Sequence, residues 1–344
     1  MKWYESSGNG NDVFAAARIR LVRNIEGYKF PGTMQPQEAQ ELLDRMQEEL
    51  RGIGEEAGME LRYVDLQDAT ETEKEAWRDR RIITDVLMKS KNPRGFFVSA
   101  DESTVIALNG DDHIRIHQFG PELNLNRLEA ACTILDDAVN RHFPYAFDEK
   151  YGYLTANPTS MGTGLKASAI LHLPYLAEGK TFRNLVTEVG RMGIRVRGLM
   201  GEGTENYGSF FEVSNQKTLG QSEEEILSLV YRMASHLAAN ERKVRSMAIR
   251  DKRVLMEDQA YKAYGIIRYA RQLSMREAMS YLSAIRSGLC EGLLTSEQPL
   301  NIFGIMWECR DATIRERRIG QLSPEECNVA RAEMIRARLS SVRE

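Results

Sequence analysis

The amino-acid sequence predicts an α+β fold, with a mainly antiparallel sheet flanked by helices and joined to a helical C-terminal domain. Up to about residue 220, short runs of alternating apolar and polar residues are interleaved with helical patterns. After that point the periodicity is almost wholly helical. The chain has 344 residues, which suits about two domains. We place the boundary so that residues 1–244 form the mixed domain and residues 245–344 the helical one.

Strands alternate with helices in the first half of the chain. The helical stretches have apolar side chains about every fourth residue, and the strands show alternation or short apolar runs between turn residues. In one strand, the alternation places Arg115 and His117 on one face and Ile114 and Ile116 on the other. Helices are predicted over residues 37–51 and 125–142, and strands over residues 95–99, 104–109, 113–119, 152–156 and 194–199.

The segment from residue 157 to residue 176 is predicted to be a glycine-containing turn that leads into a helix. This helix would carry Lys166 near its start and His172 within its apolar part. A long helix is predicted to begin at Ser222, because Ser222 and Glu225 have the spacing of a capping box. Further helices are predicted over residues 257–273, 275–287 and 323–340.

Composition limits the class of protein. The formal net charge is −4, so a globally basic nucleic-acid-binding protein is not expected. No apolar run is long enough to span a bilayer, and the first residues lack the pattern of a secretory signal. The cysteines form no CxxC pair and the histidines no HExxH motif, so we expect reduced thiols and no metal site built from side chains. These features predict a cytoplasmic protein that binds neither nucleic acid nor membrane.

Four motifs are candidates for a functional site. Arginine side chains and the free N–H groups of a helix start both suit phosphate, and carboxylates suit a cationic substrate or proton transfer. Each motif alone also has an ordinary explanation as a solvated strand face, a turn, a cap or a loop. The motifs are Arg18 with Arg20, Asp111 and Asp112 with Arg115, the small-residue turn from Asn157 to Lys166, and Arg197 with Glu202 in a glycine-containing turn.

Taken in order, these motifs resemble the ATP:guanidino phosphotransferase (phosphagen kinase) family. The resemblance lies in the patterns RxR, NxxDHxR, xPTxxGTxxxAS and RGxxGE, with matching flanks such as ARIRLVRN, DDHIRI, GYLT, ASAILHLP and RVRG. It extends from about residue 16 to the C-terminus and is greatest to the protein arginine kinases of the family. Only 17 residues precede Arg18. The members that act on small guanidino compounds have a helical domain in that place, so the short start favours a protein substrate.

The resemblance implies a reaction and a role for each motif. The γ-phosphoryl group of ATP, bound together with Mg²⁺, would be moved to an arginine side chain of a protein. The catalytic residues would be Glu202, Asp111 and Asp112. Asn157, Glu202 and Asp111 would bind the acceptor arginine. The residues implied in nucleotide binding are Arg18, Ile19, Arg20, Arg115, Lys166, Ala167, Ser168, Arg197, Gly198 and Gly201.

The resemblance also implies domains and partners. Residues 1–244 would be the catalytic domain, and residues 245–344 a helical domain with a degenerate phosphoarginine-binding region. The motif RDxxRA of that region is replaced by CNVARA at residues 327–332, where Arg331 alone is equally well explained as an ordinary residue of the helix surface. The implied partners, in stress response and protein quality control, are protein substrates with exposed arginines, a zinc-finger activator, a heat-shock repressor and a Clp unfoldase. A homodimer agrees with the resemblance, although no residue pattern marks it.

Several substitutions separate this chain from the family pattern. Asp111 is one methylene shorter than the glutamate of the family, and Gly110 replaces a second acidic residue. Asn157 stands in place of a cysteine, Val86 in place of a histidine beside the nucleotide base, and Lys166 in place of an arginine, which exchanges a bidentate fork for a point charge. Two alternatives to a protein arginine kinase therefore stay open: a catalytically impaired pseudokinase that serves as a nucleotide-binding scaffold, and a kinase for a small guanidino compound.

Overall fold

The computed structural model describes residues 1–5, 12–199, 206–318 and 322–343. The chain divides into two compact units. The first unit comprises Met1–Trp3, Ala17–Ser168 and Ser214–Tyr231, and the second comprises Tyr4–Ala16, Ala169–Val213 and Arg232–Glu344. The domain boundary that the sequence places at residue 244 stays a prediction.

The strands of the main sheet are β1 (Phe14–Arg23), β2 (Leu61–Asp65), β3 (Gly95–Ser99), β4 (Thr104–Leu108), β5 (Ile114–Pro121), β8 (Lys166–His172), β9 (Ile194–Gly198) and β10 (Phe210–Asn215). Their order in the first unit is β2-β3-β4-β5-β1-β8-β10, and in the second unit it is β1-β8-β10-β9. Strands β1, β8 and β10 appear in both orders because each contributes residues to both units. The pairs β2–β3, β3–β4 and β4–β5 are antiparallel. Short two-stranded pairs are formed by β6 (Phe147–Asp148) with β7 (Gly152–Tyr153) and by β11 (Thr295–Ser296) with β12 (Val342–Arg343).

Helices surround the strands in the first unit and dominate the second. The first unit contains α1 (Pro36–Glu49), α2 (Ile53–Glu56), α3 (Glu71–Asp79), α4 (Asp85–Lys89), α5 (Leu125–His142) and the start of α8 (Glu223–Tyr269). The second contains α6 (Pro174–Glu178), α7 (Phe182–Arg191), most of α8, α9 (Met275–Cys290), α10 (Ile302–Glu308), α11 (Asp311–Arg317) and α12 (Pro324–Arg338). Short 3-10 turns lie at Pro31–Thr33 and Pro158–Ser160.

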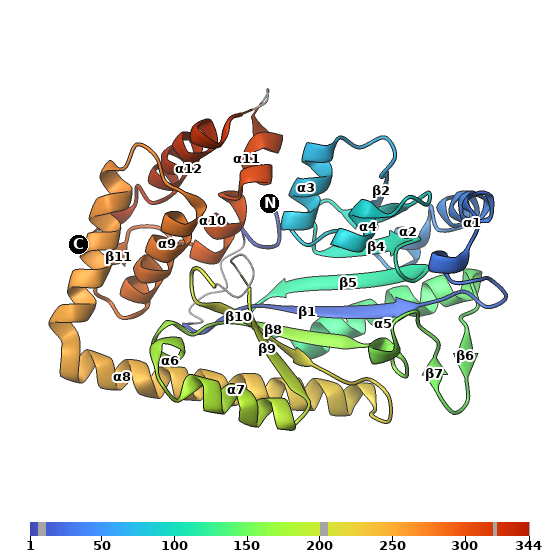
Figure 1. Cartoon of the computed structure of the whole chain (residues 1–344), viewed down its shortest axis with the longest axis horizontal. Helices are drawn as coiled ribbons and strands as arrows, with labels where there is room; N and C mark the ends of the chain where they lie inside the picture. The colour runs from blue at the N-terminus through green and yellow to red at the C-terminus, as the bar shows by residue number, and fades with distance from the viewer. Residues whose placement is uncertain (6–11, 200–205, 319–321, 344) are drawn as a thin grey trace. The chain divides into compact units, whose positions relative to one another are not determined.

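In the first unit, the two faces of the sheet have different partners. On β3 and β4 one face is apolar and packs under α3 and α4, in a cluster that includes Trp77, Leu87, Phe96, Val98, Val105 and Ala107. The other face lies against α5, which runs alongside β5 and β1 in Figure 1. Ile19 and Leu21 of β1 are buried, and on the same side Arg23 donates to Asp136 of α5 at 2.7 Å. Because side chains alternate along a strand, Arg18 and Arg20 lie on the face away from α5.

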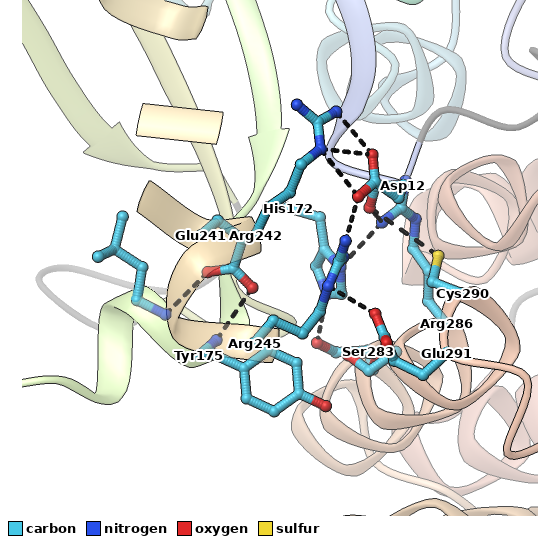
Figure 2. A network of polar contacts seen from close by, with 12 residues as sticks. Asp12, His172, Tyr175, Glu241, Arg242, Arg245, Ser283, Arg286, Cys290 and Glu291 are labelled. Carbon is cyan, nitrogen blue, oxygen red and sulfur yellow. Dashed lines mark hydrogen bonds and ion pairs between the residues drawn. The ribbon is translucent and has the colours of Figure 1, made fainter. Parts of the chain in front are cut away.

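In the second unit, a polar network fixes the segment before β1 to helices α8 and α9 (Figure 2). The carboxylate of Asp12 accepts a hydrogen bond from Arg242 at 2.7 Å and contacts Arg245. Burial raises the pKa of this carboxyl group, but the hydrogen bonds from Arg242 and Arg245 prevail and lower it to about 2. Arg286 Nη1 donates to the Asp12 carbonyl at 2.7 Å and lies 2.9 Å from His172 Nδ1. Asp12 therefore pairs with the exposed Arg242 and the largely buried Arg245, and its carbonyl accepts a hydrogen bond from the buried Arg286.

One sequence prediction is wrong, and one alternative that the sequence left open for Arg331 is excluded. Residues Lys166–His172 form strand β8 and not a helix. Six of these seven residues are buried, and a short apolar run of this kind is equally typical of a strand with both faces covered. Arg331 is fully buried and not on the helix surface, because it donates to the Cys309 carbonyl at 2.8 Å and pairs with Asp311. Burial of the side chain, with each of the three guanidinium nitrogens donating to an oxygen, makes this position a structural anchor.

Most other expectations for the fold are confirmed, but the strand predicted over residues 152–156 is limited to Gly152–Tyr153, and the helix predicted over residues 257–273 is the last part of α8, which ends at Tyr269. The predicted helices over residues 37–51 and 125–142 are α1 and α5, and the predicted hairpin is β3–β4. The capping box at the start of α8 is present, since Ser222 N donates to Glu225 at 2.8 Å and Glu225 N donates to Ser222 Oγ at 3.1 Å. The fold is α+β with a helical C-terminal region, as predicted. None of the helices in the described part of the chain combines the length and the hydropathy that a membrane span requires.

A buried carboxylate in the second unit predicts how the stability of the protein depends on pH. Glu241 is inaccessible to solvent, and its side chain accepts the N–H groups of Tyr175 and Leu176 at the start of α6. Burial outweighs these hydrogen bonds and the nearby Arg245, and it raises the pKa of Glu241 from 4.5 to about 7. The folded protein therefore binds this proton more tightly than the unfolded chain, so stability falls as the pH rises from 4.5 toward 7.

Replacement Glu241→Gln should remove this dependence while preserving the shape of the side chain. We expect the free energy of unfolding of the natural protein to fall relative to the variant by up to about 3 kcal/mol between acidic and neutral pH. The measurement is denaturant unfolding of both proteins across that range. A difference between them that stays constant with pH would contradict the assignment.

Candidate active site

The first unit carries an array of basic side chains on one face of its sheet. Val105 and Ala107 of β4 pair with His117 and Arg115 of β5, so the apolar face under α3 and α4 becomes polar on β5. The guanidinium of Arg18 lies 5.3 Å from the ring centre of Phe119, which is two residues beyond His117 on the same face. Arg18, Arg20 and Arg115 also act together on the pKa of His117. Three of the predicted nucleotide-binding arginines therefore share one face.

His117 is a member of this face that the sequence motifs did not identify as functional. Its side chain is 1% exposed, and neither ring nitrogen has a hydrogen-bond partner within the described ranges. Burial first, and then the charges of Arg18, Arg115 and Arg20, hold its pKa well below the usual value. A neutral imidazole therefore lies among three cations. The strict alternation of residues 113–119 was the sequence signal that could have drawn attention to it.

Asp111 lies at the turn between β4 and β5, where its negative charge faces Arg115. One of its oxygens, Oδ2, accepts a hydrogen bond from Arg115 Nη2 at 3.1 Å. The other, Oδ1, is buried and has no hydrogen-bond partner among the described residues. A buried carboxylate oxygen without a donor is unfavourable unless a ligand supplies one. Asp111 is therefore suited to accept a hydrogen bond from a cationic group such as a guanidinium.

Asp112 has a different environment from Asp111. It is 3% exposed, and its Oδ1 accepts hydrogen bonds from Asn24 Nδ2 at 2.7 Å and from Ala156 N at 2.6 Å. Asn24 in turn accepts the N–H of His113 at 3.0 Å and donates to the Leu154 carbonyl at 3.0 Å. Asp112 and Asn24 therefore connect the turn that holds Asp111 to the chain that leads into Asn157. This geometry favours a positioning role for Asp112 over the predicted catalytic one.

His113 fixes the same junction from the other side. Its Nδ1 accepts the N–H of Ile25 at 3.1 Å, so Nε2 carries the proton and donates to the Lys29 carbonyl at 3.0 Å. Burial lowers the pKa of His113 to about 4, which keeps the ring neutral and the hydrogen bonds intact near neutral pH. Asn24 and His113 thus hold the end of β1 against the β4–β5 turn. Sequence patterns gave no signal for Asn24, because its role depends on contacts with distant segments.

The loop from Asn157 to Lys166 is held by Arg23. Arg23 forms a buried ion pair with Asp136 at 2.7 Å and donates to the Thr163 carbonyl at 2.9 Å. Gly164 follows with a φ of 65°, and a Cβ atom there would lie 2.6 Å from Arg23 Nη1. Only glycine fits this close approach without displacing the arginine. Lys166 then begins β8, the strand next to β1 in the sheet.

Other predicted site residues in this unit make mostly structural contacts. Asn157 is exposed, and its Oδ1 accepts the N–H and the hydroxyl of Thr159 at 3.0 and 2.8 Å, as a cap of the following turn. Ile19 and Ala167 are fully buried, and Ala167 N donates to Asn215 Oδ1 at 2.9 Å. Their side chains therefore belong to the core. Ser168 is also buried.

The remaining predicted residues belong to the second unit or lie outside the described residues. Arg197 and Gly198 end strand β9, and Arg197 donates to Glu212 Oε2 at 3.2 and 2.9 Å through Nε and Nη2. The Glu212 side chain is 4% exposed, against 57% for Arg197, so a buried carboxylate orients an accessible guanidinium. Gly201 and Glu202 fall within residues 200–205 and are not described.

A small recess adjoins the polar face of the first unit. It has a volume of about 10 Å³ and is lined by Ile82, Thr84, Leu87, Ala107, Gly110, Asp112, Arg115 and His117. Val86, which replaces an expected histidine, is not part of this lining and is 52% exposed. Arg115 and His117 thus form the polar wall of a recess whose other walls are largely apolar. Because its volume is about that of one water molecule, the recess borders the polar face and does not itself enclose an organic ligand.

Comparison with known protein families agrees with this arrangement. Residues 41–244 match the family model of the ATP:guanido phosphotransferase C-terminal catalytic domain. The chain therefore belongs to the ATP:guanido phosphotransferase family, as the order of its motifs predicted. Residues 253–344 match the model of the C-terminal domain of the protein-arginine kinase McsB.

Curated relatives and solved structures lead to the same family. The protein-arginine kinase of Desulforamulus reducens is 34% identical, over 99% of this chain and 96% of that protein. The protein-arginine kinase of Geobacillus stearothermophilus is 33% identical, over 98% of this chain and 93% of that protein. Lombricine kinase aligns with a TM-score of 0.58 at 21% identity, over 70% of each chain. The duplicated taurocyamine kinase from Schistosoma mansoni aligns with a TM-score of 0.57 at 24% identity, over 70% of this chain and 34% of that one. At these identities the two structures support the fold alone.

The contacts of Asp112 generate a prediction that separates positioning from catalysis. Asp112→Ala leaves Asn24 Nδ2 without one acceptor and Ala156 N without its own, so we expect a loss of about 2–4 kcal/mol in the free energy of unfolding. Asp112→Asn keeps an acceptor oxygen in place and should cost clearly less. Measured alongside Asp111→Asn, it should retain phosphoryl transfer within about tenfold, whereas Asp111→Asn should lose about a hundredfold or more. Equal losses in the two asparagine variants would return Asp112 to a catalytic role.

Proposed function

We propose that this protein transfers the γ-phosphoryl group of ATP to arginine side chains of other proteins. The observation that carries the proposal is the array of Arg18, Arg20 and Arg115 on one sheet face, beside a buried oxygen of Asp111 that has no donor in the described part of the chain. Full-length relatives of about one-third identity are curated as protein-arginine kinases, which supports a protein as the acceptor.

The array supports the electrostatic part of the reaction. A triphosphate brings dense negative charge that must be held in line and neutralised while the transferring phosphoryl group loosens. Guanidinium groups bind phosphate oxygens through two parallel N–H groups. The basic side chains share one face in the absence of ATP, so little rearrangement is needed when it binds. Lys166, at the start of β8, would add a point charge, and Arg197, held by Glu212, would add another guanidinium.

The acceptor needs a second set of groups. A free guanidinium has a pKa above about 12, so it must lose a proton before a nitrogen lone pair can attack phosphorus. Asp111 Oδ1 would accept a hydrogen bond from the acceptor and orient it, and Glu202 would take the proton. The new N–P bond forms as the bond between the γ-phosphorus and the bridging oxygen breaks, and ADP departs with the electron pair. Asn157 would offer its amide group to the acceptor in place of the thiol of the family.

Several finer roles belong to the same proposal. In the described ranges, no three His, Cys, Asp or Glu side chains gather closely enough to hold a metal ion. Mg²⁺ would thus be held mainly by phosphate oxygens and water, and it would neutralise charge on the phosphates. The family likeness supports a cytoplasmic location, a homodimer, and partners in protein quality control that include a zinc-finger activator, a heat-shock repressor and a Clp unfoldase.

Two alternatives to a protein arginine kinase are each supported by particular features of the sequence. The changes at Gly110, Asn157 and Lys166 would suit a pseudokinase that binds nucleotide without transfer. A kinase for a small guanidino compound would use the same sheet face with a different acceptor. The retained arginine array favours nucleotide binding under all three readings, so transfer to protein is the property that decides between them.

One assay separates the three. The purified protein is incubated with ATP, Mg²⁺ and an arginine-rich protein such as casein, and phosphate on arginine is identified by mass spectrometry under conditions that preserve the N–P bond. We expect phosphoarginine in the protein substrate, reduced about a hundredfold or more in Glu202→Gln because the proton acceptor is lost. Nucleotide binding without transfer would support the pseudokinase, and transfer to free arginine alone would support the small-molecule kinase.

A further inference from the structure

An open groove in the first unit lies beside the loop that carries Asn157. It has a volume of about 450 Å³, and we call it the hairpin groove. Its walls are the β6–β7 hairpin, the turn at Gly162 and Thr163, and the segment that leads into α8. The lining residues are Phe147, Lys150, Tyr151, Gly152, Tyr153, Gly162, Thr163, Thr218, Leu219, Gly220, Gln221, Ser222 and Glu223.

Large apolar side chains in this groove are exposed. Phe147 is 59% exposed, Tyr151 42% and Leu219 46%. Single exposed apolar residues are ordinary on a protein surface, but several that line one groove indicate a binding surface. Two of the three are aromatic, and aromatic side chains give large contact area for little loss of conformational entropy. The groove is therefore suited to apolar side chains of a polypeptide.

The floor of the groove is formed before any partner binds. The rings of Phe147 and Tyr153 meet edge to face at 5.3 Å, and the guanidinium of Arg23 lies 3.7 Å from the centre of the Tyr153 ring. Tyr153 N donates to the Gly162 carbonyl at 2.8 Å, and Gly162 N donates back at 3.3 Å. Gly162 has a φ of 107°, and a Cβ atom there would lie 2.6 Å from the Thr218 carbonyl oxygen. The close contact joins the groove walls and closes the base of the Asn157 loop.

Glu223 gives the groove a negative charge that no cation pairs. Its carboxylate forms no ion pair or hydrogen bond within the described residues. Burial raises the pKa of Glu223; Arg23 lowers it, and the nearby carboxylates Glu129, Asp136 and Asp137 raise it further. Asp136 is already held by Arg23. A cation bound at Glu223 would relieve this repulsion, so this end of the groove favours a basic side chain, whereas Lys150 gives the lining a positive charge elsewhere.

We propose that the hairpin groove binds the polypeptide of a protein substrate next to its target arginine. Apolar side chains of the substrate would lie on Phe147, Tyr151 and Leu219, and a neighbouring lysine or arginine would lie at Glu223. The inference rests on the proposed function, since the target arginine must reach Asn157 and Asp111. Continuity supports it: the backbone bridge between Tyr153 and Gly162 belongs both to the groove and to the base of the Asn157 loop.

The test compares a long acceptor with a short one. The long acceptor is a peptide with one central arginine, flanked by leucine and phenylalanine and by one lysine; the short one is arginine blocked at both ends. The groove variant is Phe147→Ala, Tyr151→Ala and Leu219→Ala combined. Ile134→Ala serves as the matched control, because Ile134 is 53% exposed and lies on α5, outside the groove.

We expect the groove variant to raise the KM of the long peptide about tenfold or more, which corresponds to about 1.4 kcal/mol, with kcat nearly unchanged. The KM of the blocked arginine and the Kd of ATP should stay as they are, and the control should behave like the natural protein. Glu223→Gln should abolish the advantage of the peptide that contains lysine over one with glutamine in its place. An unchanged KM of the long peptide in the groove variant would overturn the proposal.

A binding measurement separates failure of the groove from failure of the kinase. If the natural protein transfers no phosphate yet binds the fluorescent long peptide, and the groove variant does not, the groove stands and the proposed function fails. If both proteins bind the peptide equally, the groove assignment is wrong. A groove variant that changes from dimer to monomer with an unchanged peptide KM would assign the surface to a second copy of the chain and would also overturn the proposal.

Discussion

The structure of the candidate site depends on the repulsion between basic side chains that share one sheet face. Arg18, Arg20 and Arg115 lie close enough to one another to act jointly on His117, and of the acidic residues Asp111 pairs with Arg115. Guanidinium groups gathered on one face provide the positive charge and the paired N–H donors that a triphosphate requires. His117 stays neutral within this array, because a fourth positive charge at this buried position would be repelled by the three arginines. Neutralisation of this positive charge by the phosphates of ATP explains why the arginines share one face.

The elements around the array hold it in place from the opposite face and from the strand ends. The buried pair of Arg23 and Asp136 ties β1 to α5 and fixes the Thr163 carbonyl. Asn24 and Asp112 join the end of β1, the β4–β5 turn and the chain before Asn157. None of these residues has to contact a substrate for its loss to displace the groups that do. Precise catalysis commonly depends on such supporting contacts, since a displacement of about 1 Å can reduce the rate about a hundredfold.

Sequence patterns predicted the elements whose signals are local. The period of α5, the alternation of β5 and the capping box of α8 depend only on neighbouring residues, and all three are confirmed. Strand β8 was predicted as a helix because a short run buried on both faces has no distinguishing period. The spacing of the arginines predicted part of the polar face. The roles of Asn24 and Asp112 were missed, because they arise from contacts that span 88 positions between these two residues and 44 between Asp112 and Ala156. Local patterns carry no information on such pairs. The roles of Gly201 and Glu202 stay predictions, because both lie outside the described residues.

The central claim is that Arg18 and Arg115 act together as the receptor for the phosphates of ATP. Calorimetric titration of ATP with Mg²⁺ into the natural protein, the Arg18→Gln and Arg115→Gln variants and their combination tests it most directly. Arg141→Gln is the control, because Arg141 is exposed and lies on α5, against the opposite face of the sheet. Each single change should weaken binding about tenfold or more, and the pair should be coupled rather than additive, because both side chains face one ligand. Unchanged affinity in the combined variant would contradict the account.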